Sequence, residues 1–550
     1  MKDNKKNILI ILGIAILVMI PMFLVNGYII NDDSKFHIAN ILSTLDSMNI
    51  IFPSDVLPNL FGNYGIAIRQ FYPTLAHTFI SVFMKITTLD VTISLKLFHL
   101  IELFLSGVVM YYLALNLSKN KKMALVSSVI YMLFPYHLTE IYARDALGES
   151  LLFIALPLII NGLTYLFKDK KKFLILFCFG YIIGMLSHLT MMIYFTVFLI
   201  PFFLINIKKV FKKDIIITLL EAALIILLVM SPTIINLFQN KLYGDYRVFT
   251  PYVMAQGIGH SGLWLDYINY FGIFNKTIIF NVVEHKYYID IVVLIMLLID
   301  LIIYIRLLIK RKKINISNDY IFLIIFGILS FYLASKYFPW DSLPVSFRIL
   351  QFPWRIETFL AISVSIIAPL CLKYVKDYYK YIAIILMVIL ALIFHTTIPH
   401  DEYFDKNNID YEKGIGWQLE YLPNKTYDNL DYVKSLNYDV YVNSGTSTII
   451  EDNFPNMTFE ITDNTTVQIP RIFYFGYELT NKNNEIQTIY DNEYGLIGAN
   501  LKKGKYTLKY TRTNLVNIAR VISLITVIIF IIYIFKDKII KLNEKFKIKD

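Results

Sequence analysis

Two adjacent carboxylates, soon after the first apolar segment, have the residue types for acid–base chemistry. Asp32 and Asp33 stand together, and His37 follows closely as a supporting side chain. One carboxylate of such a pair can take a proton from a hydroxyl group as a general base. The two can also hold a divalent cation, Mg²⁺ or Mn²⁺, through oxygen. The spacing alone favours a plainer role, in which Asp33 or Ser34 caps an amphipathic helix over 35–47.

Arginines suited to phosphate binding occur in two later segments. Arg348, Gln351 and Arg355 surround a Gln-Phe-Pro-Trp turn. A guanidinium can bind phosphate through paired hydrogen bonds, and Arg144 can contribute to the same task. Glu149 begins an apolar helix, where a carboxylate needs a partner. Two plainer interpretations stay open: interfacial anchoring by the later arginines, and a loop-fixing ion pair between Arg144 and Glu149.

Two further features are weaker candidates. His188 stands at the predicted tip of a helical hairpin, and the stretch Gly65–His77 combines aromatics, one arginine and a proline. For both, a structural role is favoured. His188 is a single residue without a partner in the pattern, and the aromatic residues of Gly65–His77 prefer the membrane interface in any case. The segment 239–288 has the composition of a loop that covers a substrate.

Long apolar segments make up most of the elements that must position these groups. The chain has 550 residues, of which 56% are hydrophobic and only 17% charged. Apolar runs of roughly 18–25 residues repeat along it, which is the length that crosses a hydrocarbon core of about 30 Å. The net charge of +10 comes largely from lysines in short loops. Such lysines are topology signals, so nucleic acid is not predicted as a partner.

The lysine clusters predict the orientation of these segments. Lys2, Lys5 and Lys6 place the N-terminus in the cytoplasm, ahead of an uncleaved signal anchor. Keeping every later cluster on that side predicts an all-α polytopic membrane protein with both termini cytoplasmic. The stretch 72–88 is then a re-entrant or surface helix. The predicted spans are about 7–27, 93–117, 122–138, 149–167, 173–187, 191–206, 215–238, 289–309, 319–335, 357–373, 381–396 and 514–535.

The composition changes near the C-terminus. We predict a transmembrane core over 1–397, with a long first outside loop over 28–92. Region 398–512 is rich in Asn, Asp, Thr and Tyr, and alternates like strands in Thr466–Tyr477. It is therefore predicted to be a small extracytoplasmic β-rich domain, followed by the last span and a basic cytoplasmic tail over 513–550.

Five more residues within the apolar segments bear on function. Glu102, Glu221 and Asp300 lie in predicted spans. An intramembrane carboxylate is a functional-site hypothesis by default, and Asp300, near the middle of its span, is the best evidence for a transporter. The plainer interpretation is a protonated or hydrogen-bonded side chain inside the helix bundle. Cys178 and Cys371 lie in or at the end of apolar runs, so neither a disulfide nor a metal site is predicted from them.

Taken together, these segments resemble a known family. The chain is similar to the bacterial multispanning proteins labelled 6-pyruvoyl-tetrahydropterin-synthase-related and, more distantly, to YfhO-type membrane proteins, both resembling the GT-C superfamily of polyprenyl-phosphate-dependent glycosyltransferases. The resemblance covers most of residues 1–400, and QFPWR is its most specific part. The matching stretches are NDDSKFHIANI (31–41), GNYGIAIRQFYPTLAH (62–77), YARDALGESLLFIALPLII (142–160), SHLT (187–190) and LQFPWRIETFL (350–360).

The resemblance implies a catalytic acid in the first outside loop, which falls on Asp32 or Asp33. It also implies a lipid-phosphate sugar donor reached from the outer leaflet. The chain departs from the pattern at three positions. Asn40 replaces an expected basic residue, Asp145 an expected glycine, and Thr74 the second proline of a pair. The pterin-synthase label itself is set aside, since that activity needs a zinc site of three histidines, a pattern missing from this sequence.

The sequence thus predicts an inverting membrane hexosyltransferase. It would move a sugar from a polyprenyl-phosphate donor to an acceptor glycopolymer of the cell envelope, with membrane lipid as its surroundings. Arg348, Arg355 and Arg144 would bind the donor phosphate. One alternative is a transporter or lipid flippase that uses Asp300 and Glu102. A second alternative is a non-catalytic envelope-assembly subunit that binds through its β-rich domain.

Overall fold

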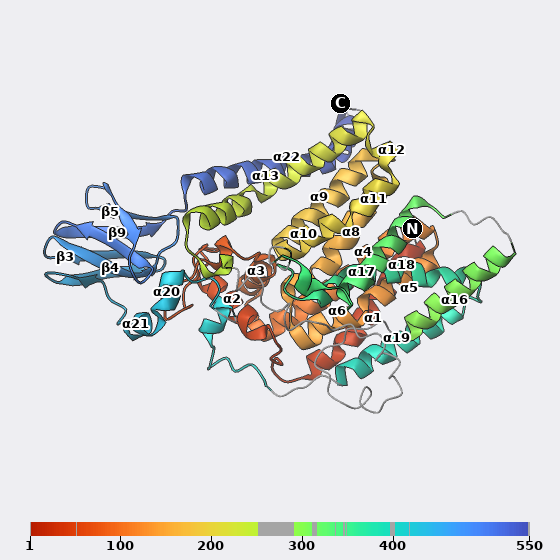
Figure 1. Ribbon diagram of the computed structural model, residues 1–550, viewed down its shortest axis with the longest axis horizontal. Coiled ribbons are helices and arrows are strands. Elements are labelled where there is room, and N and C mark those ends of the chain that lie inside the picture. Colours follow the sequence, from red (N-terminus) through yellow and green to blue (C-terminus); the bar gives the residue numbers. More distant parts are fainter. Residues whose placement is uncertain are drawn as a thin grey trace. The chain divides into compact units, whose positions relative to one another are not determined.

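The protein is mostly helical, with a small β-sheet region near the C-terminus (Figure 1). The structure is a computed structural model. Helices account for 64% of it. The residues that it describes are 2–50, 52–250, 291–310, 316–335, 337–344, 347, 349–396, 402–416 and 419–547.

The chain divides into two compact units, each built from segments far apart in the sequence. The first unit comprises the described residues within 1–34, 92–226 and 255–404. The second comprises those within 35–91, 227–254 and 405–550.

Helices form nearly all of the first unit. Their apolar sequences contain few residues that break a helix, and large apolar side chains such as Leu220, Ile302 and Ile328 remain exposed on their surfaces, as expected for helices that face lipid. The helices are α1 (Lys2–Leu24), α4 (Val91–Ser118), α5 (Lys121–Met132), α6 (Pro135–Thr139), α7 (Leu147–Ser150), α8 (Leu152–Tyr165), α9 (Lys170–Ser187), α10 (Leu189–Phe198), α11 (Ile200–Ile205), α12 (Ile207–Val210), the first part of α13 (Lys213–Tyr243), α16 (Ile291–Ile309), α17 (Asn318–Ala334), α18 (Glu357–Ile367) and α19 (Tyr379–Thr396).

Helices α8 and α9 pack through glycine. A Cβ atom on Gly162 would lie 2.8 Å from the backbone nitrogen of Phe177, and one on Gly180 would lie 2.8 Å from the carbonyl oxygen of Ala155. Small residues at such positions let two helix backbones approach closely, as is common between membrane helices.

Several helices are suited to crossing a membrane. Seven of those described are long and apolar enough, or eight if the bent pair Lys121–Met132 and Pro135–Arg144 forms one span. A multi-pass membrane protein follows from this, but the expected count of twelve spans is not confirmed. Shorter apolar helices occupy Leu75–Thr87, Leu189–Ile205, Asn318–Ala334 and Tyr379–Ile393, and the first of these lies in the stretch expected to be re-entrant.

The second unit combines two antiparallel sheets with helices. One sheet has the order β1-β4-β8-β7 and the other β2-β3-β9-β5-β6. The strands are β1 (Tyr441–Val442), β2 (Ser447–Asn453), β3 (Asn456–Ile461), β4 (Thr465–Ile472), β5 (Tyr477–Asn481), β6 (Ile486–Gln487), β7 (Ile489–Asp491), β8 (Leu496–Leu501) and β9 (Gly504–Tyr510). The helices are α2 (Ser34–Asp46), α3 (Leu75–Thr87), the end of α13, α20 (Asn424–Asp428), α21 (Leu430–Ser435) and α22 (Asn514–Lys547).

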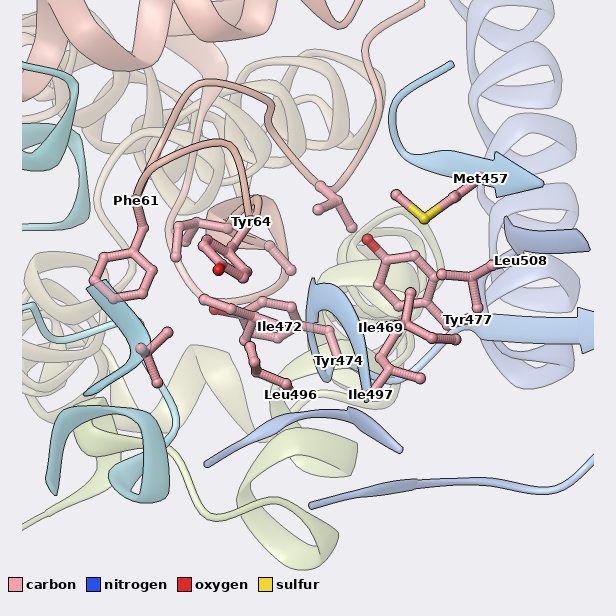
Figure 2. Packing of buried hydrophobic residues seen from close by; sticks show 14 of the residues in the cluster. Phe61, Tyr64, Met457, Ile469, Ile472, Tyr474, Tyr477, Leu496, Ile497 and Leu508 are labelled. Carbon is pink, nitrogen blue, oxygen red and sulfur yellow. The ribbon is translucent and has the colours of Figure 1, made fainter. Parts of the chain in front are cut away.

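Both sheets and part of the first long loop share one hydrophobic core. Figure 2 shows Ile469 of β4 and Leu508 of β9 in the same cluster as Phe61 and Tyr64, which come from the loop. Inward residues alternate along the strands, as the sequence predicted for β structure. The loop after α2 therefore contributes to this unit's core, because its apolar residues are buried there.

Gly65 offers a test of this loop packing. Its φ is +82°, and a methyl group there would overlap the ring of Phe454. We expect Gly65→Ala to destabilise the protein by about 1–3 kcal/mol beyond the backbone cost. Gly62→Ala is the matched control, since φ is +60° and the nearest atom would lie 3.8 Å away. The measurement is the free energy of unfolding in detergent, and equal losses in the two variants would contradict the packing.

Candidate functional site

Asp33 stands at the start of α2 and is fixed by backbone hydrogen bonds. Its N–H donates to the carbonyl oxygen of Arg144 at 2.9 Å, and the N–H of Asp32 donates to that of Ala143 at 3.4 Å. Since α2 begins at Ser34, Asp33 directly precedes the helix, in the place that the capping interpretation gave it. These contacts bring the first candidate acid beside the Arg144 segment.

The Arg144 segment differs from the expected loop. The predicted spans over 122–138 and 149–167 leave residues 139–148 as an outside loop, but Glu140–Arg144 form a π-helical turn and the stretch is buried. That prediction was wrong because the charged side chains of this stretch are paired inside the unit. A π turn inserts an extra residue in a helix and often occurs at functional sites.

Asp145 ends this turn in a left-handed conformation, with φ +57°. Aspartate tolerates that region better than most residues. The turn can therefore form with Asp145 in the place of the glycine that the family pattern has. Its carboxylate accepts hydrogen bonds from the hydroxyl of Tyr28 and pairs with Nε2 of His99, both at 2.8 Å. The buried Tyr28–His99–Asp145 group thus holds the turn that carries Arg144.

Glu149 joins two arginines at the centre of the site. Its Oε1 lies 3.1 Å from Nη2 of Arg144 and 2.8 Å from Nε of Arg355. Arg144 also pairs with Glu140 at 2.7 Å, and its Nη2 lies 3.7 Å from Oδ2 of Asp33. Three segments that are distant in the sequence therefore meet in one network of charges.

Neighbouring polar groups orient this network. The hydroxyl of Tyr136 donates to Oε2 of Glu149 at 2.9 Å. Nη1 of Arg355 donates to Oε1 of Gln351 at 2.9 Å and to the carbonyl oxygen of Leu350 at 2.8 Å. Trp354 lies close enough for its ring to face the Arg144 guanidinium, at 5.9 Å. The Gln-Phe-Pro-Trp turn thus aims Arg355 at Glu149.

His188 lies at the edge of the network in an uncharged state. Its Nε2 is 3.9 Å from Oε1 of Glu149, and its Nδ1 caps α10 by accepting from the N–H of Met191. Burial, followed by the charge of Arg355, lowers the pKa of His188 to about 3. Its imidazole is therefore neutral near pH 7 and acts as a hydrogen-bonding group.

Asp33 is the most exposed of four charged side chains in this network. The side chains of Arg144, Arg355 and Glu149 are at most 9% exposed, whereas that of Asp33 is 31% exposed. Crowding by protein atoms is the main reason that the pKa of Asp33 rises to about 6. Glu149 and Asp32 raise the pKa further, while Arg144 and Arg355 lower it. This carboxylate is accessible and changes charge near neutral pH.

The other predicted site residues lie in different surroundings. Asp32 is exposed beside Asp33. His37 lies in the second unit, where its Nδ1 is 2.7 Å from Nε2 of His77. Arg348 lies outside the described residues, as does most of the proposed covering loop over 239–288.

The intramembrane acids are partnered to different degrees. Glu102 pairs with Nε2 of His137 at 2.9 Å, with both side chains buried. Glu221 pairs with Lys170 at 2.6 Å near the surface. One carboxylate oxygen of Asp300 is buried and has no hydrogen-bond partner among the described residues.

Sequence reasoning missed several members of the site. Glu140 contacts Arg144 directly, and Glu357 is fully buried with neither carboxylate oxygen hydrogen-bonded within the described residues. Tyr28 and His99 were also not singled out. Glu357 lies in a predicted span, so the rule that selected Glu102 would have found it. No local signal marked Tyr28 or His99, because their role depends on Asp145.

Comparisons with known proteins do not identify the family. No protein-family model matches the chain, and no curated protein matches its sequence. The resemblance seen in the sequence therefore stays a prediction.

Proposed function

We propose that the protein is a membrane glycosyltransferase that takes a sugar from a polyprenyl-phosphate carrier and passes it to a hydroxyl of an envelope glycopolymer. The observation that carries the proposal is Asp33, a partly exposed carboxylate with a pKa of about 6 beside two buried arginines. A general base works best when its pKa lies near the working pH.

Asp33 acts as the base in this reaction. Its carboxylate removes the proton of the acceptor hydroxyl, and the oxygen attacks the anomeric carbon of the sugar. A carbon–oxygen bond forms as the bond from that carbon to the donor phosphate breaks on the opposite face, so the configuration inverts. The electron pair leaves with the phosphate oxygen, and the carrier departs as polyprenyl phosphate.

The arginines stabilise the charge that develops on the leaving phosphate. Arg355 already donates through Nε and Nη1, whereas its Nη2 makes no hydrogen bond within the described residues. That nitrogen is the donor we assign to the phosphate, with Arg144 and Arg348 as the other candidate contacts. Glu149 holds Arg144 and Arg355 in a fixed relation, as preorganised stabilisation requires.

Metal binding at this site would depend on two adjacent carboxylates. No group of three or more His, Cys, Asp or Glu side chains is placed to hold a metal ion among the residues that the structure describes. Asp32 and Asp33 are the residues that would hold Mg²⁺ or Mn²⁺, together with water and oxygens of a donor phosphate, and the ion would supply positive charge to the leaving phosphate. The proposed mechanism uses the protein's own residues and contains no step through a metal.

The proposal includes the finer topology expected from the sequence. Twelve spans of a GT-C-like core in the bacterial plasma membrane, with cytoplasmic termini, would place Asp33 and the arginines on the extracytoplasmic side. A lipid-linked donor can reach them there within the bilayer, and no nucleotide site is needed.

A transfer assay tests the proposal. The full-length protein, reconstituted in liposomes, is given a radiolabelled undecaprenyl-phosphate sugar and envelope glycopolymer. We expect label in the polymer, and none when the corresponding nucleotide sugar replaces the lipid donor. Because the sugar is not identified, a panel of hexosyl donors is compared. Absence of transfer from every member of the panel would contradict the proposal.

A transporter is the second candidate, favoured by the buried pair of Glu102 and His137 within predicted spans. Proton relays in transporters use such intramembrane groups. If the protein is a glycosyltransferase, Asp300→Asn should leave the transfer rate within about twofold of wild type, because Asp300 belongs to none of the site's contacts. If it is a transporter, the same variant should stop substrate movement across the vesicle membrane.

A further inference from the structure

Three arginines gather around one carboxylate in the second unit, and the proposed transfer reaction uses none of them. Nε of Arg512 donates to Oδ2 of Asp55 at 2.5 Å, and its Nη2 lies 3.3 Å from Oδ1. Nη1 of Arg520 lies 3.9 Å from the same carboxylate. Arg69 is close enough to interact electrostatically with Asp55, Arg512 and Arg520. Within the residues that the structure describes, three positive charges against one negative charge leave two uncompensated.

In the described part of the chain, Arg69 lacks both a hydrogen-bond partner for one of its nitrogens and sufficient negative charge nearby. Its Nη1 donates to the hydroxyl of Thr78 at 2.8 Å, but its buried Nε has no hydrogen-bond partner among the described residues. Burial, together with the charges of Arg520 and Arg512, lowers the pKa of Arg69, and only Asp55 opposes this shift. A buried guanidinium nitrogen without an acceptor is costly. An anion at this place would supply both the acceptor and the missing charge.

The cluster lies where the β structure gives way to an apolar helix. Strand β9 ends at Tyr510, and α22 begins at Asn514 and is apolar enough to cross a membrane. Helix α22 runs beside the end of α13 (Figure 1), where Ser523 donates to the carbonyl oxygen of Val229 at 2.8 Å. The positive end of the α22 dipole adds to the field of the arginines. The end of a helix that crosses a bilayer lies near the polar headgroup region, where lipids carry their phosphates.

We propose that Arg69, Arg512 and Arg520 form a binding site for the phosphate of an anionic membrane lipid. Arg512 remains paired with Asp55, while Arg69 and Arg520 supply the free charge. Arg520 is 44% exposed, so a headgroup can reach it from the lipid around α22. The inference concerns the second unit and does not depend on the proposed transfer reaction.

Lipid binding by the full-length protein in detergent tests the site. Native mass spectrometry measures the affinity for dioleoylphosphatidylglycerol, with dioleoylglycerol as the lipid of equal chains that lacks a phosphate. We expect wild type to prefer the phosphate lipid. Arg69→Gln/Arg520→Gln, which keeps the Arg512–Asp55 pair, should lower the affinity about tenfold or more, as expected for lost charge-assisted hydrogen bonds.

Three controls establish whether the affinity comes from these arginines. Arg247→Gln/Lys502→Gln removes two positive charges elsewhere in the unit and should leave the affinity unchanged. Arg520→Gln alone alters a half-exposed side chain, so it should weaken binding without changing the unfolding temperature. Inorganic phosphate at the same concentration should not displace the lipid. Equal binding of the two lipids, equal affinity of the Arg69/Arg520 variant and wild type, or displacement by free phosphate would overturn the lipid site.

Discussion

Replacing Asp33 with asparagine is expected to lower the rate of sugar transfer by roughly 10²- to 10⁴-fold, the usual contribution of a general base. The amide keeps the shape of the side chain but takes up no proton. Because Asp33 is partly exposed and its backbone hydrogen bonds remain, the variant should stay folded. The measurement is the initial rate of transfer from the lipid-linked donor in liposomes.

Asp32→Asn is the matched control, because the two acids are adjacent and only Asp33 lies in the buried network. It should retain activity within about tenfold of wild type, a loss well below that of a missing general base. Full activity in the Asp33 variant would remove the proposed base, and a large loss only in the Asp32 variant would transfer the role to its neighbour.

The pH dependence of the rate gives a second readout for Asp33. The base works only when it is ionised, and its pKa is raised to about 6. The rate should therefore be nearly constant above this pH and fall about tenfold per pH unit below it. The residual rate of Asp33→Asn should lack this acidic limb. An identical pH profile in the variant would show that another group titrates.

Replacing Glu149 with glutamine is expected to destabilise the protein by about 3–5 kcal/mol, as is typical when one partner of a buried ion pair is removed. Glu149 balances Arg144 and Arg355 together, and all three side chains are at most 9% exposed. The neutral amide would leave two buried guanidiniums without their shared counter-charge. The free energy of unfolding in detergent measures this loss.

The control for Glu149 is a pair at the surface. Asp377→Asn breaks the ion pair between Asp377 and Lys122. The side chain of Asp377 is 68% exposed and that of Lys122 is 47% exposed. Water already solvates these charges, so no measurable loss of stability is expected. If Glu149→Gln proved as stable as this control, the network would not be a structural centre, and Arg144 and Arg355 would need another source of order.

Local sequence patterns were sufficient for the class of protein and for part of the site. Apolar runs of membrane-spanning length predicted a multi-pass helical chain, and alternation within Thr466–Tyr477 predicted the strands near the C-terminus. Glu149 was identified because a carboxylate in an apolar helix is costly without a partner. Asp33 was identified as one of two adjacent carboxylates, and Arg355 as an arginine beside a Gln-Phe-Pro-Trp turn. Such signals depend only on neighbouring residues, so one sequence can reveal them.

The partners of those charges were decided only by tertiary structure. Arg355 reaches Glu149 from 206 positions away, and Asp145 depends on Tyr28 and His99 from two other segments. Periodicity indicates that a segment is a helix, but it does not indicate which residues meet when helices pack. The sequence therefore determined which residues needed a counter-charge, whereas the packing of distant segments selected which residue supplied it.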